Sequence, residues 1–254
     1  MFSYVNAHPV TFFFFFSLYV YLISHSACNL AIDIAFVLDA SGRRGLYNFR
    51  RIRQFVALIS RSFSISRSRA RVGVIVYGST ARMEFGLNSY TNSRSLNRAI
   101  KRLRYTRGSR KTGKALRLVF GGLFRRSRKK RVLILVTNGQ SYDSVKIPSS
   151  QIHQAGIEVF AVGVGTRVRN SELSAIATDP RHIYMVNFKT LNDIAKSIVR
   201  KACRGIEHCL FIVAIFSTTR YIPYSELGSE QGNATCSKGE PSQYILPSVV
   251  FGNF

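Results

Sequence analysis

Acidic residues are scarce in this sequence: 12 Asp and Glu stand against 37 Lys and Arg, a formal net charge of +25. The excess lies in one region, because residues 43–131 contain 26 basic residues and a single acid, Glu84. A field of one sign repels itself and favours a polyanionic partner. The simpler alternative is that these charges only keep the domain soluble.

Motifs for catalysis are also missing. The histidines at 153, 182 and 208 stand in no motif with a nucleophile, and there is no phosphate loop of the Gly-x-x-x-x-Gly-Lys type. None of the four cysteines belongs to a Cys-x-x-Cys pair, which argues against a zinc site. We therefore expect no enzymatic activity and no small-molecule substrate.

The first 27 residues contain no charged side chain, and Val10 to Ile23 is strongly apolar. A short apolar run followed by small residues is typical of a secretory signal peptide, whereas a membrane span needs about 20 apolar residues. We predict a signal peptide over residues 1–27 and a secreted, extracellular protein. Because no basic residue precedes the apolar run, an uncleaved N-terminal membrane anchor stays open as the alternative.

Apolar runs alternate with segments of helical spacing from residue 32 to residue 203. The run Ile34–Leu38 is apolar at every position, as expected of a parallel strand buried on both faces. Further strands are predicted at 71–77, 81–87 (a sheet edge), 132–137, 157–164 and 183–186. Strands that alternate with helices indicate the α/β class, with a doubly wound, mainly parallel sheet and helices on both faces.

The loop after the first strand reads Asp39-Ala-Ser41-Gly-Arg43, and the later segments Thr112-Gly113 and Thr137-Asn138-Gly139 follow at suitable spacing. Together they resemble the von Willebrand factor type A domain, which has a Rossmann-like fold. The resemblance covers residues 31–204, within a predicted domain of residues 28–204, and is strongest to the A domains of extracellular matrix proteins such as matrilins and certain collagens. It implies a non-enzymatic adhesion protein that binds a matrix or cell-surface protein.

In that family a divalent cation is held by Asp, Ser and Ser of the first loop, a Thr of the second and an Asp of the third. Asp39 and Ser41 occupy the first two positions and Asn138 the last, whereas Arg43 and Arg110 replace the other Ser and the Thr. One carboxylate beside two guanidinium groups disfavours a cation. We therefore expect a remnant site that holds no cofactor. Mg²⁺ is the metal that such a site would take, and we expect it not to bind. Either arginine could pair with Asp39; alternatively Arg43, Arg44, Arg110 and Lys111 could bind an anion.

The same resemblance implies a disulfide between Cys28 and Cys203 at the two ends of the domain. Cys209 and Cys236 would then close the C-terminal tail, residues 205–254, although the sequence alone allows three pairings. If the chain is secreted, Asn233 is a glycosylation acceptor. Free thiols in a cytosolic protein are the alternative.

The densest basic run lies in a predicted loop between a helix and the central strand. Such runs bind heparin-like glycosaminoglycan or nucleic acid, although many are only solvated surface. Glycosaminoglycan binding is therefore the alternative function to metal-independent protein binding. Intracellular nucleic-acid binding is a second alternative, against which the apolar N-terminus argues. The run comprises Arg125, Arg126, Arg128, Lys129, Lys130 and Arg131.

Overall fold

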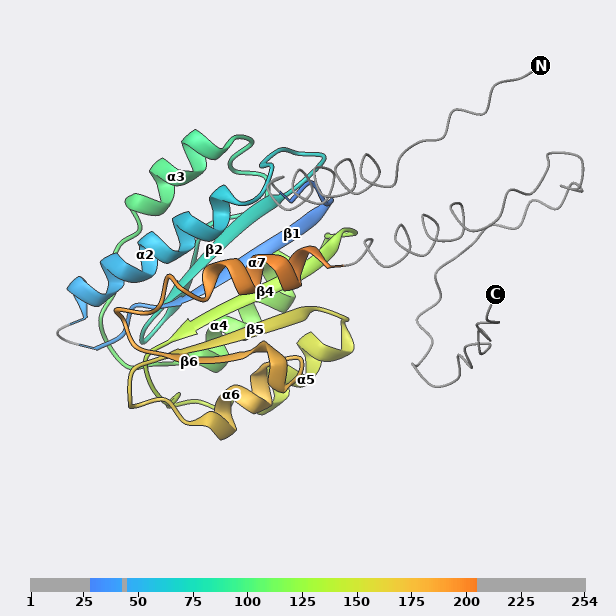
Figure 1. Ribbon diagram of the computed structural model, residues 1–254. Helices are drawn as coiled ribbons and strands as arrows, with labels where there is room; N and C mark the ends of the chain where they lie inside the picture. The colour runs from blue at the N-terminus through green and yellow to red at the C-terminus, as the bar shows by residue number, and fades with distance from the viewer. Residues whose placement is uncertain (1–27, 43–44, 205–254) are drawn as a thin grey trace, which may run out of the picture. The chain divides into compact units, whose positions relative to one another are not determined.

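The computed structural model describes residues 28–42 and 45–204. They form a six-stranded sheet in the order β3-β2-β1-β4-β5-β6 (Figure 1). Every neighbouring pair is parallel except β2 and β3, which pair antiparallel at one margin. The strands are β1 (Ile32–Asp39), β2 (Arg71–Tyr77), β3 (Ala81–Phe85), β4 (Lys130–Thr137), β5 (Glu158–Val164) and β6 (Ile183–Val186).

Helices cover both faces of this sheet, which confirms the predicted fold class. On one face pack α2 (Leu46–Arg61), α3 (Ser93–Lys101) and α7 (Ala195–Cys203); on the other pack α4 (Thr112–Leu118), α5 (Lys146–Gln154) and α6 (Asn170–Ile176). The turn Val119–Leu123 extends α4 as a π-helix, and Pro180–His182 forms a short 3₁₀ helix.

The alternation of side chains along β1 explains its unbroken apolar run. Ile34, Phe36 and Leu38 point to the core beneath α2, α3 and α7. Ala35 and Val37 point to the core beneath α4 and α5. All five side chains are fully buried, as expected for a strand covered on both faces.

Helix α5 was not predicted, and its sequence shows why. Pro148 and Ile152 are its buried apolar side chains, while Ile147 is 69% exposed, so the helical stripe is weak. Proline is accepted here because it lies in the first turn, where no intrahelical hydrogen bond is lost. Packing against α4 and α6 stabilises the helix, and this contribution is not visible in the sequence pattern.

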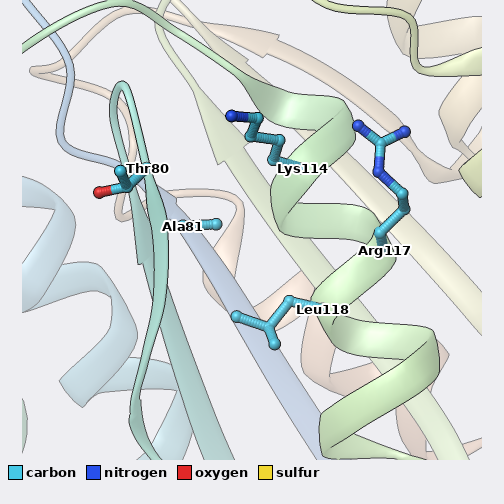
Figure 2. A pocket seen from close by; sticks show the side chains of 5 residues that line it. All are labelled: Thr80, Ala81, Lys114, Arg117 and Leu118. Carbon is cyan, nitrogen blue, oxygen red and sulfur yellow. The ribbon is translucent and has the colours of Figure 1, made fainter.

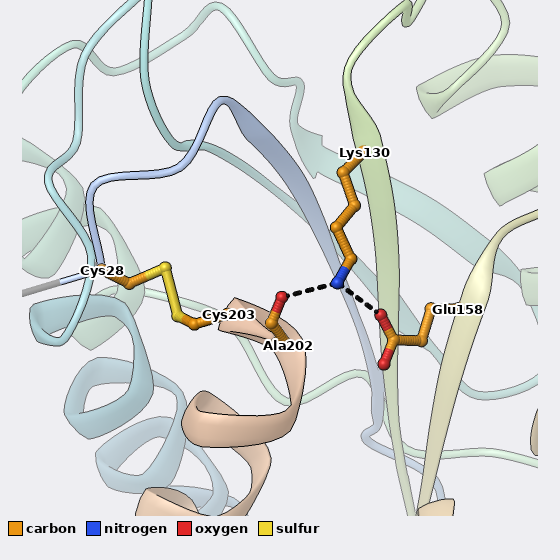
Figure 3. Close-up of a disulfide and its surroundings, with 5 residues drawn as sticks. All are labelled: Cys28, Lys130, Glu158, Ala202 and Cys203. Atoms are coloured by element: carbon orange, nitrogen blue, oxygen red, sulfur yellow. Dashed lines mark hydrogen bonds and ion pairs between the residues drawn. A yellow bond between two sulfur atoms is a disulfide. The ribbon is translucent and has the colours of Figure 1, made fainter. Parts of the chain in front are cut away.

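The basic run 125–131 is only partly a loop, which corrects the prediction. β4 begins at Lys130, so Lys130 and Arg131 pair with Ile32 and Asp33 of β1. The Lys130 ammonium lies 3.0 Å from a Glu158 carboxylate oxygen and donates to the Ala202 carbonyl at 2.8 Å (Figure 3). These contacts, and a hydrogen bond from Arg131 to the Ala155 carbonyl, explain why two charged residues belong to a central strand.

The structure contains the disulfide between Cys28 and Cys203 that the resemblance implies (Figure 3). It joins the segment before β1 to the last residue of α7, across 175 positions of sequence. Cys209, Cys236, Asn233 and the predicted signal peptide lie outside the described residues. No helix in 28–42 or 45–204 is long and apolar enough to cross a membrane.

Candidate functional site

The strands β1, β2, β4 and β5 end at one edge of the sheet, which we call the carboxyl edge. Asp39, the last residue of β1, lies there with its side chain fully buried. One carboxylate oxygen accepts the Ser41 amide at 2.9 Å. The other accepts the Thr137 hydroxyl at 3.2 Å, the Asn138 amide at 3.1 Å and Arg110 Nε at 2.6 Å. The negative charge is therefore fully engaged within the protein.

Arg110 lies in the crevice above Asp39 and is 14% exposed. Besides its ion pair with Asp39, its Nη2 donates to Asn138 Oδ1 at 2.5 Å and its Nη1 to the Gln140 carbonyl at 3.1 Å. Gly139 makes room for this arrangement, since a Cβ there would lie 2.6 Å from Nη1. The guanidinium thus bridges the ends of β1 and β4.

Backbone contacts position Arg110. Arg107, with φ of 63°, donates its amide to the Ala40 carbonyl at 2.7 Å just after β1. On the other side of Arg110, the Lys111 amide donates to the Gly78 carbonyl at 3.2 Å. The Arg110 carbonyl itself accepts the Tyr142 amide at 2.8 Å. The loop is therefore held by the chain that follows β1, β2 and β4.

Asp143 supports the same region, and the sequence analysis missed it. Its two oxygens accept the amides of Gly113 and Lys114, each at 2.8 Å, at the start of α4. Helix α4 has no side-chain cap of its own, because its N-cap residue is Lys111. A carboxylate from a distant loop thus satisfies the free amides and favours the positive end of the helix. The available signal was that Asp143 is the only acidic residue between Glu84 and Glu158.

Two buried hydroxyl groups lie near Asp39. The Tyr77 hydroxyl accepts the Thr112 hydroxyl at 3.2 Å, and burial, with the charge of Asp39 as a second cause, raises the pKa of Tyr77 well above its usual value. This phenol stays protonated at neutral pH. Ser41 Oγ is also buried and has no hydrogen-bond partner among the described residues, while the Ser41 carbonyl accepts the Tyr105 hydroxyl.

The residues at the carboxyl edge do not fit a divalent cation. Mg²⁺ needs oxygen ligands, one or more of them carboxylates. Among the predicted ligand positions only Asp39 carries a carboxylate, which is occupied by four donors, and Asn138 offers its amide oxygen to Arg110. Ser41 Oγ is left as the one predicted ligand atom without a partner in the described part of the chain. The guanidinium supplies positive charge where the resemblance implies a cation.

The remaining predicted residues separate into two places. Lys111 lies beside Arg110 at the carboxyl edge, whereas Arg43 and Arg44 lie outside the described residues. The basic run 125–131 precedes and begins β4, so it lies at the opposite edge, which we call the amino edge. The structure therefore divides the predicted anion-binding residues between two edges of the sheet.

Known proteins show the same architecture. The family model of the von Willebrand factor type A domain matches residues 33–199. Mouse vitrin is 37% identical over 181 residues, covering 69% of this chain and 28% of vitrin; human cochlin is 34% identical over 184 residues, covering 70% and 33%. This chain therefore spans about a third or less of these curated relatives, which are extracellular matrix proteins.

A solved structure agrees. Proximal thread matrix protein 1 of the mussel byssus superposes with a TM-score of 0.67 at 27% identity, covering 70% of this chain and 47% of the mussel chain. In another structure of the mussel protein, with a TM-score of 0.65, the metal-ion-dependent adhesion motif holds zinc. With the fold, the order of the edge loops and the family match in agreement, this chain belongs to the von Willebrand factor type A domain family.

Proposed function

We propose that this chain is a secreted, non-enzymatic extracellular matrix protein that binds a protein ligand at the carboxyl edge without a metal ion. The observation that carries the proposal is the position of Arg110. Its guanidinium bonds to Asp39, to Asn138 and to the Gln140 carbonyl, so a fixed positive group stands at the centre of the edge. A tethered cation of this kind does not depend on metal concentration.

The donors of Arg110 indicate the chemistry of the ligand. A guanidinium has five N–H groups. Three of them bond to Asp39, Asn138 and Gln140, which leaves two, and the side chain remains 14% exposed. Carboxylates accept such paired donors well. We therefore expect the partner to place an acidic side chain over Arg110.

Exposed apolar side chains surround the crevice. Seven large hydrophobic residues are exposed in the described part of the chain, and four of them follow β1 or β4 at the carboxyl edge: Leu46, Tyr47, Tyr142 and Ile147. Tyr142 is 76% exposed, and its backbone contacts that of Arg110. Tyrosine and arginine anchors beside aliphatic side chains are typical of protein interfaces.

A groove extends this surface toward the sheet margin. It lies between the start of β3 and helix α4 and is lined by Thr80, Ala81, Lys114, Arg117 and Leu118 (Figure 2). Its two cations and its apolar floor would suit an acidic segment of a protein partner. Small-molecule sites are usually enclosed, whereas this groove is open.

Metal independence can be tested by calorimetric titration of the full chain with MgCl₂, paired with binding to cell-deposited matrix in EDTA. We expect no heat of Mg²⁺ binding and matrix binding that survives EDTA. The Arg110→Thr, Asn138→Asp variant should gain Mg²⁺ binding, because two oxygen ligands replace a guanidinium and an amide. Mg²⁺ binding by the unaltered chain that Asp39→Ala abolishes would overturn the proposal.

The role of the edge itself needs a separate variant. Tyr142→Ala removes an exposed side chain, so it should weaken matrix binding without lowering stability. Met185→Ala, a 49% exposed residue on β6, is the matched control. Equal binding by both variants would place the ligand elsewhere.

A further inference from the structure

Two loops that are distant in sequence come together at the amino edge. The Lys129 ammonium donates to the Arg67 carbonyl at 2.7 Å and to the Arg69 carbonyl at 2.8 Å. This contact joins the loop before β2 to the loop before β4. Five exposed arginines then lie on the joined loops, and we call them the amino-edge arginines: Arg67, Arg69, Arg125, Arg126 and Arg128.

A buried acid holds the two loops together without adding negative charge to the surface. Asp33 is fully buried and forms a two-point ion pair with Arg71, with Nε at 2.7 Å and Nη2 at 2.5 Å. Its second oxygen also accepts the Ser127 hydroxyl. Burial, with the charge of Arg71 as a second cause, lowers the pKa of Lys129. The Asp33 carboxylate is thus neutralised inside the protein and adds no negative charge to the surface.

The amino-edge arginines differ from the rest of the basic run in their partners. Within the described residues, the side chains of Arg67, Arg125, Arg126 and Arg128 form no hydrogen bond or ion pair, and Arg69 bonds to Asn29. The head groups of Lys129, Lys130 and Arg131 are instead bound to protein carbonyls. The structure thus separates three structural cations from the solvent-facing arginines.

We propose that the amino-edge arginines bind a sulfated polysaccharide of the glycosaminoglycan type. The proposal rests on the extracellular placement proposed above, but not on the ligand at the carboxyl edge. Arginine binds sulfate with two parallel hydrogen bonds, and a row of arginines releases counterions from a polyanion when it binds. Lys129 acts as a positioning residue, because it holds the two groups of arginines on one surface.

Other polyanions suit this surface less well. Single-stranded nucleic acids are held by stacking of bases on exposed aromatic side chains. The loops carry no such side chain, since Phe124 is 2% exposed and Phe63 is buried as well. A lipid surface would call for exposed apolar side chains beside the basic ones. None of the seven large exposed hydrophobic residues in the described part of the chain lies on these loops, and the single one near them in sequence is Phe120, which is 40% exposed.

The test is affinity of the full chain for a heparin oligosaccharide between 50 and 200 mM NaCl. Each lost contact should remove about 0.7 from the slope of log affinity against log salt. Raising the salt fourfold weakens binding of the unaltered chain by some factor. That factor should be roughly 20-fold smaller for the triple variant Arg125→Ala, Arg126→Ala, Arg128→Ala, and roughly 7-fold smaller for the double variant Arg67→Ala, Arg69→Ala. The control removes three exposed arginines from and just after α3: Arg94→Ala, Arg98→Ala, Arg102→Ala.

Each outcome decides the proposal. Loss in both loop variants but little in the α3 control, with unchanged thermal unfolding, supports a two-loop site. Equal loss of heparin affinity in all three variants would mean that binding depends on net charge and not on a defined site. Unchanged affinity in the Arg67, Arg69 variant would confine the site to the run 125–131. Either result overturns the proposal of a two-loop site. Tighter binding to a single-stranded RNA or to phosphatidylserine vesicles at the same salt would overturn the assignment to a polysaccharide. Matrix binding by Tyr142→Ala reports separately on the carboxyl edge.

Discussion

Replacing Arg110 by alanine removes the positive partner of a fully buried carboxylate. Breaking a buried ion pair from one side costs about 3–5 kcal/mol, because the remaining charge is left without compensation. Asp39 keeps three neutral donors, from Ser41, Thr137 and Asn138, which lowers the penalty. We therefore expect Arg110→Ala to lower the free energy of unfolding by about 3 kcal/mol.

Urea unfolding in EDTA, with the disulfide intact, measures this loss. A domain of this size loses about 2–4 °C of melting temperature per kcal/mol, so a thermal scan should show a fall of roughly 6–12 °C. The stability of Arg110→Lys should lie between that of the unaltered chain and that of Arg110→Ala, because lysine keeps the charge but cannot reproduce the planar fork of donors.

The matched control is Arg117→Ala. Arg117 also pairs with a carboxylate, Asp143, but at 3.4 Å and with 51% of its side chain exposed. Exposed pairs contribute about 0–1 kcal/mol, so this variant should be nearly as stable as the unaltered chain. Equal losses for Arg110→Ala and Arg117→Ala would refute the inference that the crevice guanidinium neutralises Asp39.

Two further predictions concern stability. Replacing Cys28 and Cys203 by serine should cost about 2–5 kcal/mol, because the bridge closes a long loop in the unfolded chain; a shift of the urea midpoint checks this, and no shift would contradict it. A hydrogen bond from Arg181 is the main cause that lowers the pKa of Asp179 below its ordinary value of 3.8. Since the folded pKa is the lower one, this stability is present above about pH 4 and is lost as the pH falls below it. The free energy of unfolding of Asp179→Asn should therefore fall less steeply below pH 4 than that of the unaltered chain. Equal pH dependence of the two chains in urea unfolding would contradict this.

The strands were predictable because a buried parallel strand needs apolar side chains at every position. Ile34–Leu38 has them, and β2 and β6 occupy the predicted ranges. Helix α5 was not predictable, because packing on its neighbours compensates for a weak stripe. The start of β4 was placed too late, because Lys130 is neutralised by Glu158, a residue distant in sequence.

The candidate site was predictable in its composition but not in its arrangement. The motif around Asp39 and the replacement residues Arg110 and Asn138 are read directly from the sequence. The sequence left open whether an arginine pairs with Asp39 or the arginines bind an anion, and the structure shows that Arg110, 71 positions away, forms the ion pair. Asp143 was missed for the same reason, because the amides that it binds belong to another loop.

Fold class and family follow from the sequence alone, because they depend on residue type and on local spacing. Which cations are neutralised and which face solvent is visible only once the chain is folded. Arg110 and Lys130 are engaged inside the protein, whereas Arg67 joins Arg125 on one surface through Lys129. The physical reason is that electrostatic partners are chosen by distance in space, and folding sets that distance independently of separation along the chain.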